Sequence, residues 1–189
     1  MQKATCCICI LAGGLSERMR RDKSALRLGS RTLLGRIRAE ARKLGLRVRV
    51  IRRDLVPRCG PLGGVLTGLK TSRAEAELFL ACDMPFVSAG LLEELLACWK
   101  ADPRPVFMAL GRRAGFPFLV AVEVLPVVER QILKKQYSLQ QLAQALTATL
   151  LRPTRERRRE LFNVNTPADW QAACRRWTRQ GRSSPLPSA

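Results

Sequence analysis

A turn that follows the first apolar run combines glycines with cationic side chains. The run Cys6–Leu11 leads into Gly13 and Gly14, and Arg18 and Lys23 follow. Glycines let backbone N–H groups face an anion because no Cβ stands in the way. The two cations can neutralise phosphates held by those N–H groups. The turn predicts a phosphate-binding loop, although its spacing matches neither the P-loop nor the dinucleotide fingerprint; the alternative is an ordinary strand–helix turn with solvated charges.

Two acidic residues also come just after strand-like runs, of which Leu46–Ile51 alternates apolar and charged residues. Asp83 ends the run Leu78–Cys82, and Asp54 follows the run Leu46–Ile51. A carboxylate at a strand end suits Mg²⁺, which usually binds one or two carboxylates together with substrate phosphates. Together with the cationic loop, Asp83 supplies the minimum needed for nucleotidyl transfer. The alternatives are that Asp83 serves as a turn or cap residue, and that Asp54 either contacts a nucleobase or ribose or caps a turn.

Strand-like and helix-like segments alternate along the chain and must position these residues. This alternation predicts a three-layer α/β domain with a mostly parallel sheet, in which ligands bind beyond the carboxyl ends of the strands. The predicted strands are Thr5–Leu11, Leu46–Ile51, Leu78–Cys82, Val106–Leu110, Phe116–Val122 and Ala148–Leu151. The predicted helices are Thr32–Leu44, Pro61–Lys70, Ala89–Lys100, Leu125–Lys134, Leu139–Leu146 and a last helix capped by Thr166.

Length and hydropathy indicate one globular domain. At 189 residues and 47% hydrophobic content the chain can bury a core, and we expect one domain over residues 1–180 with a disordered Pro/Ser tail over 181–189. Apolar runs fall short of the roughly 18 residues that a membrane span needs, so we expect no membrane partner. The N-terminal run reads as a strand rather than a signal peptide, which favours a cytoplasmic protein.

The charge of the chain is strongly positive, with 34 Lys and Arg against 15 Asp and Glu. Such a surface attracts polyanions without specifying one. The sequence has no aromatic-and-basic module that reads bases, so we expect no specific nucleic-acid partner. Seven cysteines with no histidine and no second CxxC motif to pair with Cys6–Cys9 favour buried free thiols over a metal site.

Four motifs resemble those of the MobA family, the molybdenum cofactor guanylyltransferases. They occur in the family's order and are the stretch from Leu11 to Lys23, Gly60–Gly64, Cys82–Pro85 and Asn163–Pro167. The resemblance implies a Rossmann-like nucleotidyltransferase fold. It also implies transfer of GMP from GTP to the terminal phosphate of Mo-molybdopterin, with release of pyrophosphate and with Mg²⁺ as cofactor. The related cytidylyltransferase branch reads LAAG in the first loop, so Gly13 and Gly14 favour guanine.

Site residues carry over from the resemblance by motif. The residues expected to bind GTP are Leu11, Ala12, Gly13, Gly14, Lys23, Asp54 and Asp83. The residues expected to be catalytic are Arg18, Lys23 and Asp83, of which Asp83 is expected to bind the metal. Asn163 and Asn165 match positions on the molybdopterin side of the site.

Two departures from the family pattern keep other functions open. Arg20 stands where the family has glycine, and the segment between the second strand and Gly60 is short. A degenerate adaptor that binds GTP or molybdenum cofactor without catalysis is therefore one alternative, and a cytidylyltransferase of the same superfamily is another. If the enzyme is active, its further partners are expected among proteins that make or accept molybdenum cofactor.

Overall fold

A computed structural model describes residues 6–13 and 25–182 of the chain, with side chains through Arg179. The elements along the chain are β1 (Cys6–Leu11), β2 (Arg27–Leu28), β3 (Arg31–Thr32), α1 (Leu33–Arg42), β4 (Arg47–Ile51), α2 (Pro61–Lys70), β5 (Ala76–Ala81), α3 (Ala89–Ala101), β6 (Val106–Leu110), β7 (Arg113–Ala121), η2 (Val122–Val124), α4 (Leu125–Leu133), α5 (Leu139–Ala145), β8 (Thr149–Leu151), η3 (Arg157–Leu161) and α6 (Pro167–Arg182).

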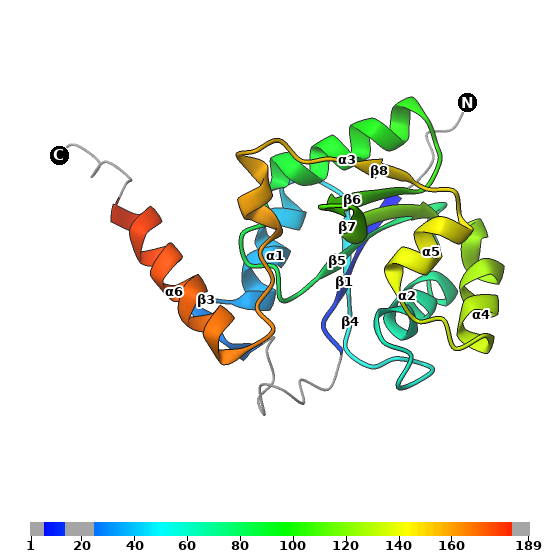
Figure 1. Cartoon of the computed structure of the whole chain (residues 1–189), viewed down its shortest axis with the longest axis horizontal. Coiled ribbons are helices and arrows are strands. Elements are labelled where there is room, and N and C mark those ends of the chain that lie inside the picture. Colours follow the sequence, from blue (N-terminus) through cyan, green and yellow to red (C-terminus); the bar gives the residue numbers. More distant parts are fainter. Residues whose placement is uncertain (1–5, 14–24, 183–189) are drawn as a thin grey trace.

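A six-stranded sheet in the order β4-β1-β5-β7-β6-β8 forms the middle layer. All of its pairs are parallel except the two made by β7, which runs antiparallel to both of its neighbours. Helices α1 and α3 cover one face, and α2, α4 and α5 cover the other (Figure 1). The predicted three-layer α/β fold with a mostly parallel sheet is confirmed.

The central position of β1 explains its nearly continuous apolar sequence. Ile8 and Ile10 pack into the core under α1 and α3, whereas Cys9 and Leu11 pack into the core under α2. A parallel strand covered on both faces needs apolar side chains at successive positions. All seven cysteines are free thiols, and burial raises the pKa of Cys9 to about 12. Of the seven, only Cys9 and Cys59 are fully buried.

Hydroxyl side chains cap the starts of α1 and α3. Thr32 accepts a hydrogen bond from the Gly35 amide at 2.9 Å, and Ser88 accepts one from the Leu91 amide at 3.2 Å. Each bond satisfies an amide of the first helical turn that has no partner within the helix. Helix α6 continues through Arg182, two residues into the segment expected as a tail, and residues 183–189 lie outside the described part of the chain.

The C-terminal helix packs on a short hairpin that the sequence did not predict. Strands β2 and β3 form this antiparallel hairpin, and Leu28 belongs to a small core shared with Ala173 of α6. The guanidinium of Arg36 lies 3.6 Å from the ring centroid of Trp177 and donates to the Leu28 carbonyl at 2.7 Å. Residues far apart in the sequence therefore close one side of the domain.

Candidate active site at the carboxyl ends of the strands

The carboxyl ends of the adjacent strands β4, β1 and β5 bring the residues after β1 together with those after β4 and β5. The Ala12 amide donates to the Ile51 carbonyl at 2.8 Å, and the Cys82 amide donates to the Leu11 carbonyl at 3.1 Å. These bonds extend the ladders of β1 with β4 and β5 by one residue beyond the strands. Leu11 and Ala12 therefore lie between the residues that follow β4 and those that follow β5, as the carboxyl-end rule predicts.

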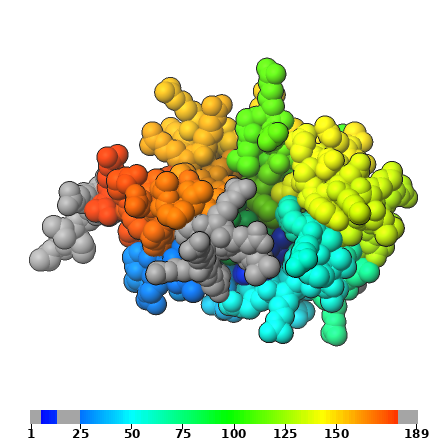
Figure 2. Space-filling view, turned by 60° about the horizontal axis from the view of Figure 1, so that its bottom comes forward, coloured from blue at the N-terminus to red at the C-terminus, as the bar shows by residue number. Residues whose placement is uncertain are grey.

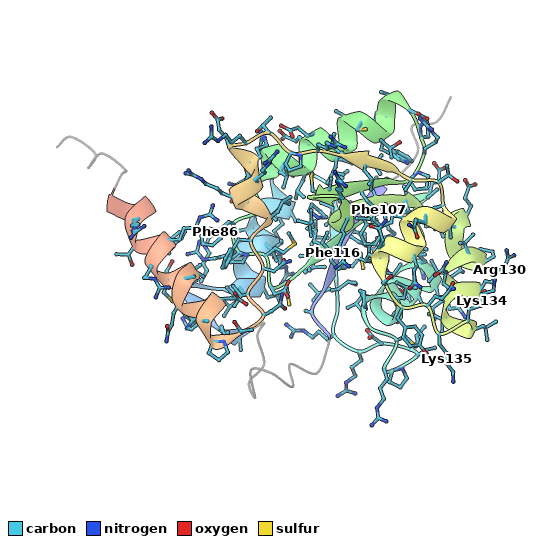
Figure 3. All side chains as sticks on the ribbon, in the orientation of Figure 1. Phe86, Phe107, Phe116, Arg130, Lys134 and Lys135 are labelled. Carbon is cyan, nitrogen blue, oxygen red and sulfur yellow. The ribbon has the colours of Figure 1, made fainter. Side chains whose placement is uncertain are left out.

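Opposite sides of this edge carry the other predicted segments. Figure 2 turns the edge toward the reader, with residues 52–60 (cyan) on one side and η3 and α6 (orange) on the other. The positively charged residues Arg130, Lys134 and Lys135 lie far from α6, whereas Phe86 lies close to it (Figure 3). One segment from the first half of the chain and one from the last third thus lie on the two sides of this edge (Figure 2).

Gly13 leaves no room for a larger residue. An added Cβ would lie 2.7 Å from the carbonyl oxygen and 2.9 Å from the carbonyl carbon of Arg52. Both atoms belong to the backbone that follows β4, which cannot turn away as a flexible side chain can. The loop after β1 can approach this backbone closely only because residue 13 is glycine.

Replacing Gly13 with alanine should therefore weaken nucleotide binding by about 1–3 kcal/mol, the usual cost of forcing extra atoms into a packed site. Isothermal titration with GTP and Mg²⁺ would measure the change. Gly45→Ala is the control, because an added Cβ there meets nothing within 4 Å; its positive φ makes the backbone strain a cost to stability rather than to the site. Equal affinities for wild type and Gly13→Ala would contradict the close approach.

Asp54 lies against the first turn of α2. An added Cβ on Gly63 would lie 2.8 Å from Asp54 Oδ2, and one on Gly64 would lie 3.0 Å from Leu11 Cδ1 and 3.4 Å from Asp54 Oδ1. The two glycines thus let the Asp54 carboxylate and the end of β1 meet at the same turn. The Leu55 amide donates to Thr67 Oγ1 at 2.8 Å, which fixes the loop to α2.

The carboxylate of Asp54 does not cap this helix. Gly60 is the N-cap of α2, and no side chain makes a capping hydrogen bond there. Within the described residues no group donates a hydrogen bond to Asp54, and partial burial raises the pKa of its carboxyl group. A half-buried acceptor beside Leu11 favours the ligand-contacting interpretation of Asp54 over the capping one.

Asp83 joins the site to the C-terminal third of the chain. The Asp83 carbonyl accepts a hydrogen bond from the Val164 amide at 2.9 Å. The neighbours of Val164 are Asn163 and Asn165, so the structure brings both predicted asparagines next to the predicted metal ligand. Asn163 Oδ1 is buried and has no hydrogen-bond partner among the described residues. An orphaned acceptor of this kind is costly unless a ligand supplies a donor.

The segment of residues 162–165, called here the asparagine segment because it contains Asn163 and Asn165, is held by the cap of α6. The amides of Asn165 and Thr166 donate to Asp169 Oδ2 at 3.0 and 2.8 Å, and the Asp169 amide donates to Thr166 Oγ1 at 3.1 Å. These reciprocal bonds are the Asp counterpart of a capping box. They fix where the segment ends and confirm the predicted start of the last helix.

The remaining predicted site residues, Gly14, Arg18 and Lys23, lie outside the described residues, as does Arg20. Among the described residues no group of three His, Cys, Asp or Glu side chains could enclose a metal ion. A single strand-end carboxylate such as Asp83 nevertheless fits Mg²⁺, because this ion commonly takes most of its ligands from water and substrate phosphates. The geometry accordingly fits a metal that arrives with a nucleotide.

Sequence reasoning missed one set of residues near the site. Glu160 accepts hydrogen bonds from the Ser88 amide at 3.0 Å and from Ser88 Oγ at 2.5 Å. Ser88 directly precedes the predicted helix Ala89–Lys100, but nothing in the sequence around Glu160 signals a partner 72 residues away. The link ties the segment after Asp83 to the segment before Asn163.

The sequence profile of the MobA-like NTP transferase domain matches residues 8–154. The chain belongs to this family. The match includes the end of β1, Asp54, the first turn of α2 and Asp83, whereas Asn163 and Asn165 lie beyond it. Family membership makes the chain a nucleotidyltransferase, and these segments converge at the edge of the sheet where the sequence predicts its site.

Relatives and solved structures agree with this assignment. A molybdenum cofactor guanylyltransferase of Pseudomonas putida (strain GB-1) is 33% identical over 160 residues, which cover 71% of this chain and 80% of the relative. One from Xanthomonas euvesicatoria is 31% identical over 177 residues, covering 85% and 90%. The crystal structure of molybdopterin-guanine dinucleotide biosynthesis protein A from Archaeoglobus fulgidus shares the fold, with a TM-score of 0.71, 21% identity, and coverage of 91% of this chain and 98% of the other.

Within the described residues, no helix of this MobA-like chain combines the length and the apolar character needed to cross a membrane.

Proposed function

We propose that the chain transfers the GMP moiety of GTP to Mo-molybdopterin and releases pyrophosphate. A terminal phosphate oxygen of molybdopterin attacks the α-phosphorus of GTP, and the bond from that phosphorus to the oxygen bridging to the β-phosphate breaks. The observation that carries the proposal is the hydrogen bond between Asp83 and Val164. This bond lies between Asp83, the predicted metal ligand, and the residue that stands between Asn163 and Asn165, which are predicted on the molybdopterin side. The relatives of the chain bear this activity in their names.

Each side of the site has a task that follows from its chemistry. The lack of a Cβ at Gly13 lets the loop after β1 lie against the Arg52 backbone, where its amides are proposed to face the nucleotide. Asp54 offers a half-buried hydrogen-bond acceptor to the N–H groups of a guanine or to ribose hydroxyls. Asp83 is the proposed ligand of Mg²⁺, which would neutralise charge on the phosphates. Asn163 offers an acceptor on the opposite side, where the molybdopterin is proposed to bind.

Arg18 and Lys23 complete the proposal as phosphate contacts and Gly14 as part of the nucleotide loop. Their chemistry fits charge that builds up on the leaving pyrophosphate, because positioned cations stabilise such charge most in the transition state. Product is proposed to pass to proteins that accept molybdenum cofactor, and the place of action is proposed to be the cytoplasm. The net positive charge of the chain is expected to attract anionic ligands generally rather than a specific nucleic acid.

GTP with Mg²⁺ should raise the melting temperature more than CTP or ATP does. A ligand that binds only the native state stabilises it by about 2.7 kcal/mol at 100 times its Kd, so a base preference appears directly as a difference in melting temperature. Differential scanning fluorimetry at matched nucleotide concentrations would measure the three shifts. Equal shifts would contradict the guanine preference, and a larger shift with CTP would favour the cytidylyltransferase.

Pyrophosphate release with Mo-molybdopterin then separates catalysis from mere binding. We expect release with GTP that depends on both Mg²⁺ and molybdopterin. A chain that binds GTP and molybdopterin but releases no pyrophosphate would be the non-catalytic adaptor.

A further inference from the structure

Two segments that flank the proposed site run side by side in opposite directions. One follows Asp83 to the start of α3, and the other follows η3 to the asparagines. Three contacts join them in order: Asp83 O with Val164 N at 2.9 Å, the ring of Phe86 with that of Phe162 at 6.1 Å between centroids, and Ser88 with Glu160. The two contacts nearest to Asp83 and Asn163 are a single backbone hydrogen bond and an edge-on ring pair. The strongest contact lies at the far end.

The strength of that far contact comes from the two oxygens of the Glu160 carboxylate. Oε2 accepts from both the amide and the hydroxyl of Ser88, and Oε1 accepts from Arg157 Nη1 at 3.2 Å. The Ser88 hydroxyl at the same time caps α3 by accepting from the Leu91 amide. A carboxylate at a helix N-terminus is favoured by the helix dipole, and hydrogen bonds to a charged group are about twice as strong as neutral ones.

Arg157 ties this contact to the body of α3. Its guanidinium pairs with Glu94 at 2.6 Å as well as with Glu160. An added Cβ on Gly90 would lie 2.9 Å from Arg157 Nη2, so the guanidinium lies directly on the first turn of the helix. Glu160 is thus fixed from two directions. Only Glu160, and not Glu94, belongs to the segment that leads to the asparagines.

The two sides of the pair differ in how firmly the rest of the fold holds them. Asp83 follows β5, and the amides of Cys82 and Met84 donate to the carbonyls of Leu11 and Ala81 at 3.1 and 3.4 Å. The sheet therefore places Asp83 without help from Glu160. Residues 162–165 belong to neither a strand nor a helix. Val164 is buried in the small core with Leu28 and Ala173, and the contacts at both ends set how the segment enters and leaves that core.

We propose that Glu160 is a positioning residue, which sets Asn163 against Asp83 by fixing the start of the asparagine segment to Ser88. The consequence for catalysis rests on the proposed function, in which Asn163 contacts molybdopterin and not the nucleotide. Loss of the contact should therefore impair use of molybdopterin and spare the binding of GTP. A cation–π contact from α6 remains, because the guanidinium of Arg176 lies 4.0 Å from the Phe86 ring centroid.

Glu160→Ala is the test, with Glu94→Ala as its matched control. Both variants remove a carboxylate that binds Arg157, but only the first removes the acceptor for the Ser88 amide and hydroxyl. In both variants Arg157 Nη1 can still donate to Ser88 Oγ, at 3.3 Å in the wild type. We expect Glu160→Ala to raise the KM for molybdopterin about tenfold or more, because small misplacements of a binding group are costly. The KM for GTP and the GTP-induced melting shift should stay within about twofold of wild type. Glu160→Gln, which keeps an acceptor for Ser88, should recover most of the loss.

Amide hydrogen exchange on the ligand-free protein supplies a readout that needs no activity. The Val164 amide should exchange faster in Glu160→Ala than in Glu94→Ala, because its bond to the Asp83 carbonyl is held less firmly. Unchanged exchange would overturn the proposal, and so would faster exchange with an unchanged KM for molybdopterin in an active enzyme. If the wild-type chain transfers no GMP to molybdopterin, the proposed function fails, while the exchange rates still decide whether Glu160 holds the segment.

Discussion

Asp83→Asn should lower kcat for GMP transfer at least about 100-fold, because a bound metal and positioned charge supply several kcal/mol of transition-state stabilisation. The substitution removes the charge and keeps the shape of the side chain. The hydrogen bond from the Val164 amide goes to the backbone carbonyl of residue 83, so the asparagine segment should stay in place. Pyrophosphate release at saturating GTP and molybdopterin, measured over a series of Mg²⁺ concentrations, would give the effect.

Asp102→Asn makes the same chemical change away from the site. Asp102 follows α3 and pairs with Arg104 on the surface, so its loss should leave kcat unchanged. Both variants should melt as cooperatively as wild type. A value of kcat near that of wild type for Asp83→Asn would exclude this carboxylate as the metal ligand, and a selective loss that high Mg²⁺ repairs would identify it as one.

The sequence sufficed to predict that most segments of the candidate site lie together, because strand ends carry a strong local signal. Leu11 ends one strand-like run, whereas Asp54 and Asp83 come just after two others, and parallel strands bring their carboxyl ends to one edge. Gly13 could be read in the same way, since glycine is required where two backbones nearly touch. The asparagines could not be placed by this rule, because they follow no strand; only the resemblance to a known family assigned them.

Contacts between distant segments were the part that the sequence could not reveal. Glu160 and Ser88 are 72 residues apart, and either residue alone looks like an ordinary surface or capping residue. The sequence did not predict the hairpin of β2 and β3 for another reason. Two-residue strands are too short to show an alternating pattern. The antiparallel β7 changes the sheet without changing the site, because it lies beyond β5 from β1.

Glu77 shows how a tertiary contact can override a local pattern. The charged residue made the predicted strand begin at Leu78, yet β5 includes Glu77, which is fully buried. Arg49 makes this possible by reaching across β1 from β4 to pair with Glu77 at 2.8 Å. Ser72 Oγ donates a second hydrogen bond to the same oxygen at 2.5 Å. A charge on an otherwise apolar strand is compatible with the core only because these partners come from other elements.

Arg49→Met should lower the free energy of unfolding by about 3–5 kcal/mol near pH 8, the usual result of leaving one charge of a buried pair uncompensated. The substitution keeps the aliphatic stem and removes the guanidinium. It also removes donors to the Gly68 and Thr71 carbonyls, at 2.8 and 2.9 Å, which close the end of α2. Lys70→Met is the control, because the exposed pair of Lys70 with Glu129 should contribute only about 0–1 kcal/mol.

The pH dependence of this loss follows from the Glu77 carboxyl. Burial already raises its pKa above the ordinary value of 4.5, even though Ser72 and Arg49 lower it. The protonated Glu77 carboxyl therefore contributes fully to the stability of the folded state below pH 4.5. This contribution is lost as the pH rises through the folded-state pKa. Removing Arg49 raises that pKa further, so the deficit of Arg49→Met should be small near pH 4.5 and grow toward pH 8. Urea unfolding at both pH values would show this, and Glu77→Gln added to Arg49→Met should abolish the growth; a deficit independent of pH would mean that the lost carbonyl contacts, and not the charge pair, carry the stability.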